Sequence, residues 1–299
     1  MTTRRMTFFA IILISALSAQ AQEYAFKVLV NKGKNELKSG STWQPIKVGA
    51  SLKSADELKI SENSYLGLVH VSGKALEWKK AGNYTVMELA AHVGGGSSVL
   101  NKYTDFILTS NNTTKNKLAA TGAVDRGVDN IQVYLPKSEQ AVIYNNEVLI
   151  TWDGTAAPGP YVVTFKSLFE DELDVVKTNE PFASIKLDDP NFTNEDNILV
   201  EVASASNKNK VSDRYTLKKL SKADKERIKT ALSEIENPTS EPTALNKLLI
   251  AGFYEQNNLL IDAGTAYLEA IRLAPDVPQY QEAYNDFLLR NALKKPAAK

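Results

Sequence analysis

The first part of the chain alternates short apolar runs with turn-forming residues. Between residues 24 and 85, runs with the composition of β-strands are separated by Gly, Asn and Ser. These runs cover residues 26–30, 57–60, 65–71 and 75–78, and turn signals stand at 31–33, 38–40 and 72–74. Each turn signal contains a glycine, which can adopt the positive φ that a tight turn demands. The pattern predicts a compact all-β unit of short strands.

Residues 86–127 have a different pattern. Their composition favours a short helix over residues 87–93, and the glycine run 94–96 would end it. Ser97 or Ser98 can cap a second helix that runs to Leu108. Residues 110–117 contain no apolar side chain, which predicts a loop and a candidate linker. Residues 22–127 are therefore expected to form a β module with one or two short helices.

Strand-like runs return from residue 128. Candidate strands cover residues 131–135, 141–144, 148–152, 161–166, 173–176, 183–187, 198–203 and 215–217. About seven strands over roughly 90 residues are typical of an immunoglobulin-like sandwich. We expect such a domain over residues 128–220.

The last part of the chain, residues 221–299, has a helical pattern. Ser221 can cap a helix that runs to about residue 235, before Pro238 and Pro242 interrupt it. Residues 279–293 predict a terminal helix. The predicted fold class is therefore multidomain, with an all-β N-terminal module, a β-sandwich middle domain and an α-helical C-terminal tail.

The spacing inside this tail resembles a tetratricopeptide repeat. The residues that carry the resemblance are Ile250, Ala251, Tyr254, Ala263, Tyr267, Ala270 and Pro275. Lys247 stands where the family usually has Trp. One repeat is fewer than the three that a solenoid core needs, so the tail is expected either to dock on the sandwich or to join a partner.

The helical tail has two interpretations. It forms a groove for a partner peptide, or it is a helical cap that completes the fold. In the groove interpretation the contributing side chains are Tyr254, Asn257, Tyr267 and Arg272. The two tyrosines stand at inward positions, which favours packing for them.

Residues 30–77 carry a second resemblance. Their motifs are Trp43-Gln44-Pro45-Ile46, Val48-Gly49, Ser64-Tyr65-Leu66-Gly67-Leu68 and Gly73-Lys74-Ala75-Leu76-Glu77. In this order they resemble the extracytoplasmic FecR-like domain of bacterial envelope proteins. The resemblance implies a small β-rich periplasmic module used for protein contact, with no catalytic residues.

A third resemblance lies in the predicted sandwich. Residues 148–152, a Pro/Gly turn at 156–160 and residues 161–165 resemble the early strands of a fibronectin type III domain. The resemblance implies that Trp152 packs in the core of that domain.

The N-terminus has the pattern of a secretory signal peptide over residues 1–21. Arg4 and Arg5 precede an apolar run at 8–17 and the small-residue exit Ala19-Gln20-Ala21. We expect cleavage after Ala21 and a periplasmic or exported protein; an uncleaved anchor helix is the alternative. No later stretch approaches the roughly 20 apolar residues of a transmembrane helix. The envelope layer stays open at this point.

Composition excludes several classes of function. The chain has 299 residues, 35 Lys+Arg, 35 Asp+Glu and no cysteine. Without cysteine there is no disulfide framework, thiolate metal site or cysteine nucleophile. The balanced charge argues against nucleic acid as a partner, because a binder of phosphates needs a surplus of Lys and Arg.

Motifs for catalysis or metal binding are missing from the sequence. His70 and His92 are the only histidines, too few for an ordinary zinc site, and no hydrolase or phosphate-loop motif is present. The acidic run 170–172 fits solvated turn charges. Residues 188–197 offer many oxygens but lack the Gly and closing Glu of an EF-hand, so a calcium loop and an inter-strand turn both stay open. We predict no enzyme, no catalytic residue, no metal and no cofactor.

The function expected from these patterns is a non-enzymatic exported protein. It would act in protein–protein interaction or as a scaffold component of the bacterial cell envelope, with other envelope proteins as partners. The alternative is a carbohydrate-binding envelope module, which needs exposed aromatic platforms. Trp43, Trp78 and Trp152 all lie in strand contexts, which favour core positions.

Overall fold

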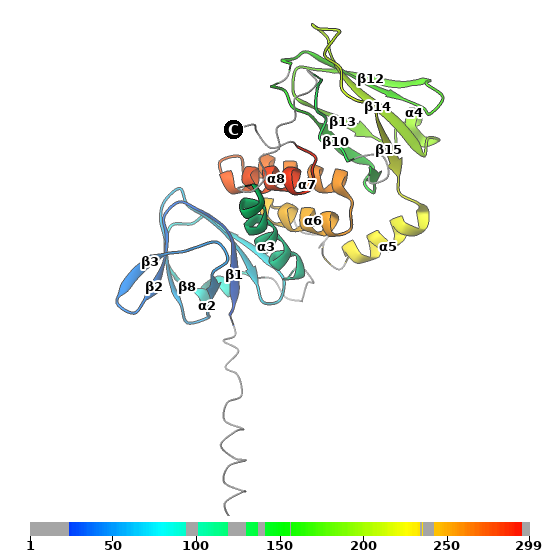
Figure 1. The fold of residues 1–299 in the computed structure, drawn as a ribbon. Coiled ribbons are helices and arrows are strands. Elements are labelled where there is room, and N and C mark those ends of the chain that lie inside the picture. Colours follow the sequence, from blue (N-terminus) through cyan, green and yellow to red (C-terminus); the bar gives the residue numbers. More distant parts are fainter. Residues whose placement is uncertain are drawn as a thin grey trace, which may run out of the picture.

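The computed structural model describes residues 24–93, 101–118, 130–136, 141–155, 157–233, 235 and 242–294. Within them, β-sheets form the N-terminal and middle parts and helices form the C-terminal part, as the sequence predicts (Figure 1). The predicted signal peptide, the glycine run 94–96 and the candidate caps Ser97 and Ser98 lie outside the described residues.

Two four-stranded antiparallel sheets build the N-terminal part, in the orders β4-β1-β6-β7 and β3-β2-β5-β8. The strands are β1 Phe26–Lys32, β2 Asn35–Ser39, β3 Thr42–Pro45, β4 Ser51–Leu52, β5 Glu57–Ile60, β6 Tyr65–His70, β7 Ala75–Trp78 and β8 Gly82–Thr85. Their shared core includes Phe26, Val28, Leu58 and Leu66. The four predicted strands are confirmed, and β2, β3, β4 and β8 are additional.

Turns in the N-terminal part follow the glycine pattern. Gly33, Gly40 and Gly73, one in each predicted turn, all have positive φ. At Gly33 the fit is tight as well, because a Cβ there would lie 2.5 Å from the Oγ atom of Ser64. A side chain at this position would meet both backbone strain and a steric clash.

Two helices follow these sheets. Helix α2, Val86–Ala90, begins with a capping box in which Thr85 and Glu88 bond each other's backbone N–H groups. Helix α3 spans Asn101–Leu118, so the prediction of a loop at 110–117 is wrong. An established helix gains one hydrogen bond with each added residue, and polar composition alone does not end it.

Two sheets share a core in the middle part of the chain. One has the order β12-β11-β14-β15-β9, and β10 and β13 form the other. The strands are β9 Val142–Ile143, β10 Glu147–Thr151, β11 Tyr161–Lys166, β12 Glu172–Thr178, β13 Phe182–Lys186, β14 Asn197–Ser204 and β15 Tyr215–Lys219. Trp152 lies in this core at 2% exposure, with its ring centroid 5.1 Å from that of Tyr161.

Seven of the eight strands predicted for the middle part are present. The eighth, at 131–135, is reduced to a single bridge between Val133 and Trp152. Further along β10 the N–H of Leu149 is bonded by Thr265 of helix α7 instead, as described below. A short helix, α4 Pro190–Thr193, stands between β13 and β14 and buries Phe192.

Four helices form the C-terminal part: α5 Lys222–Ser233, α6 Ala244–Gln256, α7 Leu260–Leu273 and α8 Pro278–Arg290. Ala251, Ala263 and Ala270 are fully buried, so small residues stand where the helices are closely packed. Helix α3 approaches α6 closely, because a Cβ at Gly252 would lie 3.2 Å from Ile107. We call α3, α6, α7 and α8 the helical core.

The helical core lies between the two β parts (Figure 1). Its largest cluster of buried side chains also contains Leu29, Val30, Tyr65 and Val69 from the N-terminal sheets. Ile261 of α7 belongs to the core of the middle part. The sequence predicted that the tail docks on the sandwich or joins a partner; in the structure the helices contact both β parts of the same chain.

In the described part of the chain, no helix combines the length and the apolar character needed to cross a bilayer.

Candidate interaction surfaces

The N-terminal sheets meet the helical core through polar bonds set in an apolar contact. The hydroxyl groups of Tyr65 on β6 and Tyr280 on α8 lie 2.7 Å apart. Gln279 donates to the carbonyl of Asn31 at 2.7 Å. Burial raises the pKa of both tyrosines, so both stay neutral in this contact.

The carboxylate of Glu77 adds a bond at the start of α6. It accepts from the backbone N–H of Leu245 at 2.7 Å. The first N–H groups of a helix have no partner within the helix, and the helix dipole favours a negative charge at this end. Glu77 belongs to β7, so one sheet residue both caps the helix and fixes the sheet against it.

The middle part meets the helical core along the edge of β10. Thr265 of α7 accepts from the backbone N–H of Leu149 at 2.9 Å, and Tyr284 of α8 bonds the Thr151 hydroxyl at 2.8 Å. A strand edge carries N–H and C=O groups that would otherwise be open to pairing with another chain. Thr265 therefore occupies the edge N–H of Leu149, and Tyr134 bonds the carbonyl of Thr151 further along the same strand.

Asp262 of α7 is the most buried charged residue of this interface. It is fully buried, and its two carboxylate oxygens accept from the backbone N–H groups of Tyr144 and Asn145 at 2.9 and 2.8 Å. Burial raises the pKa of Asp262 to about 6, while the two N–H bonds act in the opposite direction. The carboxylate therefore replaces strand pairing just before β10 begins.

The four residues predicted for a partner groove have different environments. Tyr254 is buried, with its hydroxyl 3.2 Å from Asn145 of the middle part, and Tyr267 is fully buried. Asn257 ends α6, and its side chain donates to the carbonyl of Phe253. Arg272 is exposed in the last turn of α7. Both tyrosines thus serve contacts within the chain, and the groove stays a prediction.

Tyr267 belongs to a buried ionic network. Arg290 of α8 donates through Nε and Nη2 to the two carboxylate oxygens of Glu255, each at 2.6 Å, and it also donates to the Tyr267 hydroxyl. Asn291 adds a bond to Glu255 at 2.8 Å. Burial alone would lower the pKa of Arg290, but the bonds to Glu255 outweigh it and the pKa is raised. This network joins α6, α7 and α8.

The oxygen-rich loop at 188–197 has an internal cation. The ammonium group of Lys219 on β15 bonds the carbonyl of Phe192 and lies 3.5 Å from that of Thr193. Asp189 caps α4 by accepting from the N–H of Asn191. Lys219 therefore supplies a positive charge to the carbonyl oxygens at the end of α4. Within the described ranges, no group of three or more His, Asp or Glu side chains is placed to hold a metal.

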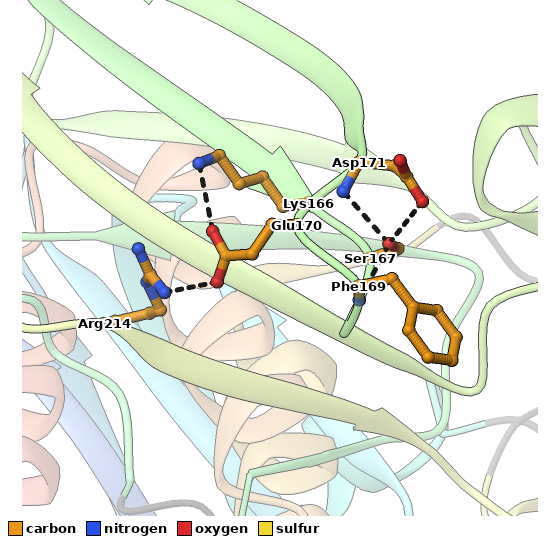
Figure 2. Close-up of polar contacts among 6 residues, drawn as sticks. All are labelled: Lys166, Ser167, Phe169, Glu170, Asp171 and Arg214. Carbon is orange, nitrogen blue, oxygen red and sulfur yellow. Dashed lines mark hydrogen bonds and ion pairs between the residues drawn. The ribbon is translucent and has the colours of Figure 1, made fainter.

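The hairpin between β11 and β12 carries the most exposed large apolar side chain of the described chain. We call residues 167–171 the hairpin tip. Phe169 is 88% exposed and Leu168 is 53% exposed. Figure 2 shows the Phe169 ring pointing away from the polar groups of the tip.

Hydrogen bonds fix the backbone of the hairpin tip. The buried Ser167 hydroxyl accepts from the N–H groups of Phe169 and Asp171 at 3.1 and 3.2 Å (Figure 2). The Ser167 N–H donates to the carbonyl of Asp171, and the Ser167 carbonyl accepts from the N–H of Glu170. Glu170 has φ +69°, which turns the chain back into β12.

Two cationic side chains, Lys166 and Arg214, form ion pairs with the carboxylate of Glu170. Lys166 lies 3.2 Å and Arg214 2.5 Å from its carboxylate oxygens (Figure 2). Lys166 and Arg214 also line a shallow depression on the outer face of the five-stranded sheet, together with Thr164 and Leu199. The tip and this depression form one continuous surface.

Sequence reasoning missed the hairpin tip because it considered only the acidic run 170–172, which overlaps the end of the tip. The available signal was a pair of large apolar residues, Leu168 and Phe169, in the turn between two strands. Turns favour Gly, Pro, Asn, Asp and Ser, and these two residues have no such role.

The three tryptophans differ in exposure. Trp152 is buried, whereas Trp43 and Trp78 are half-buried. The ring of Trp78 is contacted by those of Tyr84 and His92, each at 5.0 Å between centroids. Trp43 lies on β3, at the edge of its sheet, and belongs to none of the three hydrophobic clusters found among the described residues.

Comparison of the chain with models of known protein families finds no match, and a search of the curated proteins finds none.

Proposed function

We propose that this protein is a non-enzymatic exported component of the bacterial cell envelope that acts as a protein-interaction scaffold. One observation carries the proposal: the same helical core contacts both β parts through buried side chains. Parts of a chain move relative to each other unless their interface is large and apolar. With both β parts held by one core, their outer surfaces would be presented to partners at a fixed separation.

The strand order supports an immunoglobulin-like assignment for the middle part. In that family one sheet contains strands C, F and G, and the other contains B and E. Here β11, β14 and β15 are neighbours in one sheet, and β10 pairs with β13 in the other. Domains with this architecture commonly serve recognition, although fold alone does not establish function.

The assignments of the other parts rest on residue patterns. We propose a FecR-like N-terminal module from the order of its motifs, and a tetratricopeptide-like tail from its spacing and its buried alanines. Export is proposed from the charged, apolar and small-residue pattern of the first 21 residues. Other envelope proteins are the expected partners.

A role without catalysis is supported by how the described buried charges are used. Asp262 bonds two backbone N–H groups, and Glu255 bonds Arg290. Catalytic groups with shifted pKa values usually face a cleft that a substrate can enter. The contacts of these three side chains instead connect parts of the fold.

The proposal is tested by fractionating the cells that produce the full chain and capturing it through a C-terminal tag from their envelope fraction. We expect the chain in that fraction, together with partners that capture it reciprocally when they carry the tag. An unrelated exported protein with the same tag is the control. A chain confined to the cytoplasmic fraction, or one with no reciprocal partner, would refute the proposal.

Carbohydrate binding is the second candidate, and the half-buried Trp43 on an edge strand favours it. Sugars stack on exposed aromatic faces, and Trp43 lies outside the clustered cores. Calorimetry with envelope polysaccharide would show binding that Trp43→Ala abolishes. Trp78→Phe is the matched control, because Trp78 is already covered by other rings. Absence of binding by the wild-type protein would remove this candidate.

A further inference from the structure

The hairpin tip combines features that its fold does not require. Backbone bonds and the Ser167 hydroxyl close the turn, and none of them involves the side chain of Leu168 or Phe169. An exposed phenylalanine on its own needs no explanation. Here two large apolar side chains are adjacent at the end of a protruding hairpin, which is where binding residues concentrate.

The tip is also held in one conformation by hydrogen bonds and ion pairs, which matters for affinity. Ser167 fixes the turn from inside, and Lys166 and Arg214 hold Glu170 from the sheet face. Binding costs free energy when a flexible loop must be ordered, so an ordered loop binds more tightly. An aromatic side chain presented in this way has the properties of an interface hot spot.

The charges around the tip indicate the chemistry of its partner. Both nearby cations are engaged by Glu170, and the exposed residues next along the chain are Asp171, Glu172 and Asp174. The rim is therefore acidic and would be complementary to Lys and Arg. The same charges disfavour an anionic lipid surface, which attracts basic segments.

We propose that the hairpin tip is a docking element that inserts Phe169 and Leu168 into an apolar pocket, rimmed by basic residues, on a second envelope protein. This inference rests on the proposed scaffold function and names the surface that performs it.

The first experiment uses the full chain in the cells that produce it, with the photo-reactive residue benzoylphenylalanine in place of Phe169. Two control chains carry it at Phe182, which is 44% exposed in the same β part, or at Met87 in the N-terminal part. We expect position 169 to cross-link to one heterologous protein. Cross-links only to a second copy of this chain or to lipid would overturn the inference, as would no cross-link at 169.

These outcomes separate the inference from the proposed function. If Phe182 or Met87 cross-links to other proteins while position 169 does not, the scaffold function stands and the docking tip is wrong. If none of the three positions cross-links to another protein, the docking tip is wrong, and the reciprocal capture described above decides the scaffold function separately.

The second experiment measures binding of the purified partner to the purified full chain. We expect Phe169→Ala to raise the Kd roughly thirtyfold, as for a hot-spot residue, and Phe182→Ala to leave it within about twofold. Glu172→Lys should weaken binding and slow association, and salt should reduce the association rate of the wild type. An unchanged Kd for Phe169→Ala, or tighter binding by Glu172→Lys, would contradict the inference.

Discussion

Replacement of Asp262 by Asn tests the interface between the helical core and the middle part. Asp262 is fully buried and accepts from two backbone N–H groups of the segment that leads into β10. Asn has nearly the same shape but never ionises, and its NH2 group would face an N–H donor. The substitution therefore separates the charge of the side chain from its volume.

The magnitude follows from the pKa of Asp262. Burial raises it to about 6, above the value of 3.8 for the free side chain. The folded state prefers the protonated form of Asp262, so protonation of this side chain stabilises the fold. This stabilisation is fully present below the unfolded pKa and is lost as pH rises through about 6. The difference between the folded and unfolded pKa of Asp262 corresponds to ~3 kcal/mol of free energy of unfolding. About 2 kcal/mol of this is lost between pH 4.5 and 7.5.

The assay is urea denaturation of the wild type and of Asp262→Asn at several pH values from 4.5 to 7.5. At pH 4.5 we expect the variant to be less stable by about 1–3 kcal/mol, because one buried N–H loses its acceptor. This deficit should shrink by ~2 kcal/mol, or reverse, by pH 7.5. Other titrating groups cancel in the difference between the two proteins.

A difference that does not change with pH would refute this reasoning, because Asp262 would then have the same pKa in the folded and unfolded states. A deficit that grows toward pH 7.5 would show that the two N–H bonds outweigh burial and hold the pKa below its ordinary value.

Three other substitutions test the remaining contacts by urea denaturation at pH 7. Tyr65→Phe removes the hydroxyl bond to α8 and should cost about 1–2 kcal/mol; no loss would contradict a buried contact between the sheet and the helices. Arg290→Met leaves Glu255 buried without its cation and should cost about 3–5 kcal/mol. Arg290→Met with Glu255→Leu should restore part of this loss, because the Tyr267 hydroxyl then lacks both of its partners; a double variant as unstable as the single one would argue against a buried ion pair. Gly33→Ala should lower the free energy of unfolding clearly more than Gly40→Ala. Both glycines have positive φ, but only Gly33 lies against a neighbouring side chain. Equal losses would show that backbone strain alone acts at both positions.

Local patterns were sufficient for much of the fold. The strands β5, β7 and β11 have the predicted bounds, because alternation and turn residues act within a few positions of each other. The turn at 38–40 was predicted, but the strands β2 and β3 on either side of it were missed, since both are short and polar and are fixed by the pairing of β2 with β3 and β5. The loop expected at 110–117 is helical, because its helix is anchored by Tyr103 and Ile107 on distant helices.

The interaction surfaces were harder to predict. Spacing identified Tyr254 and Tyr267 as inward positions, but their partners Asn145 and Arg290 are distant in sequence. The role of Asp262 depends on its contact with the segment between β9 and β10, more than 100 residues away in the sequence. The exposure of Phe169 depends on the conformation of the hairpin tip. The alternation of buried and exposed side chains along a strand does not continue into a turn, so the sequence pattern could not predict this exposure.

The central claim is that the helical core holds the two β parts as one rigid scaffold. Pulsed electron resonance tests it directly, because the chain has no cysteine and two can be introduced for spin labels, at the exposed positions Gln44 on β3 and Lys177 on β12. The account predicts one narrow distribution of distances between the two spin labels in the full chain. This distribution should broaden in Tyr280→Ala, which removes the contact of α8 with Tyr65. A broad distribution for the otherwise unchanged chain would contradict it.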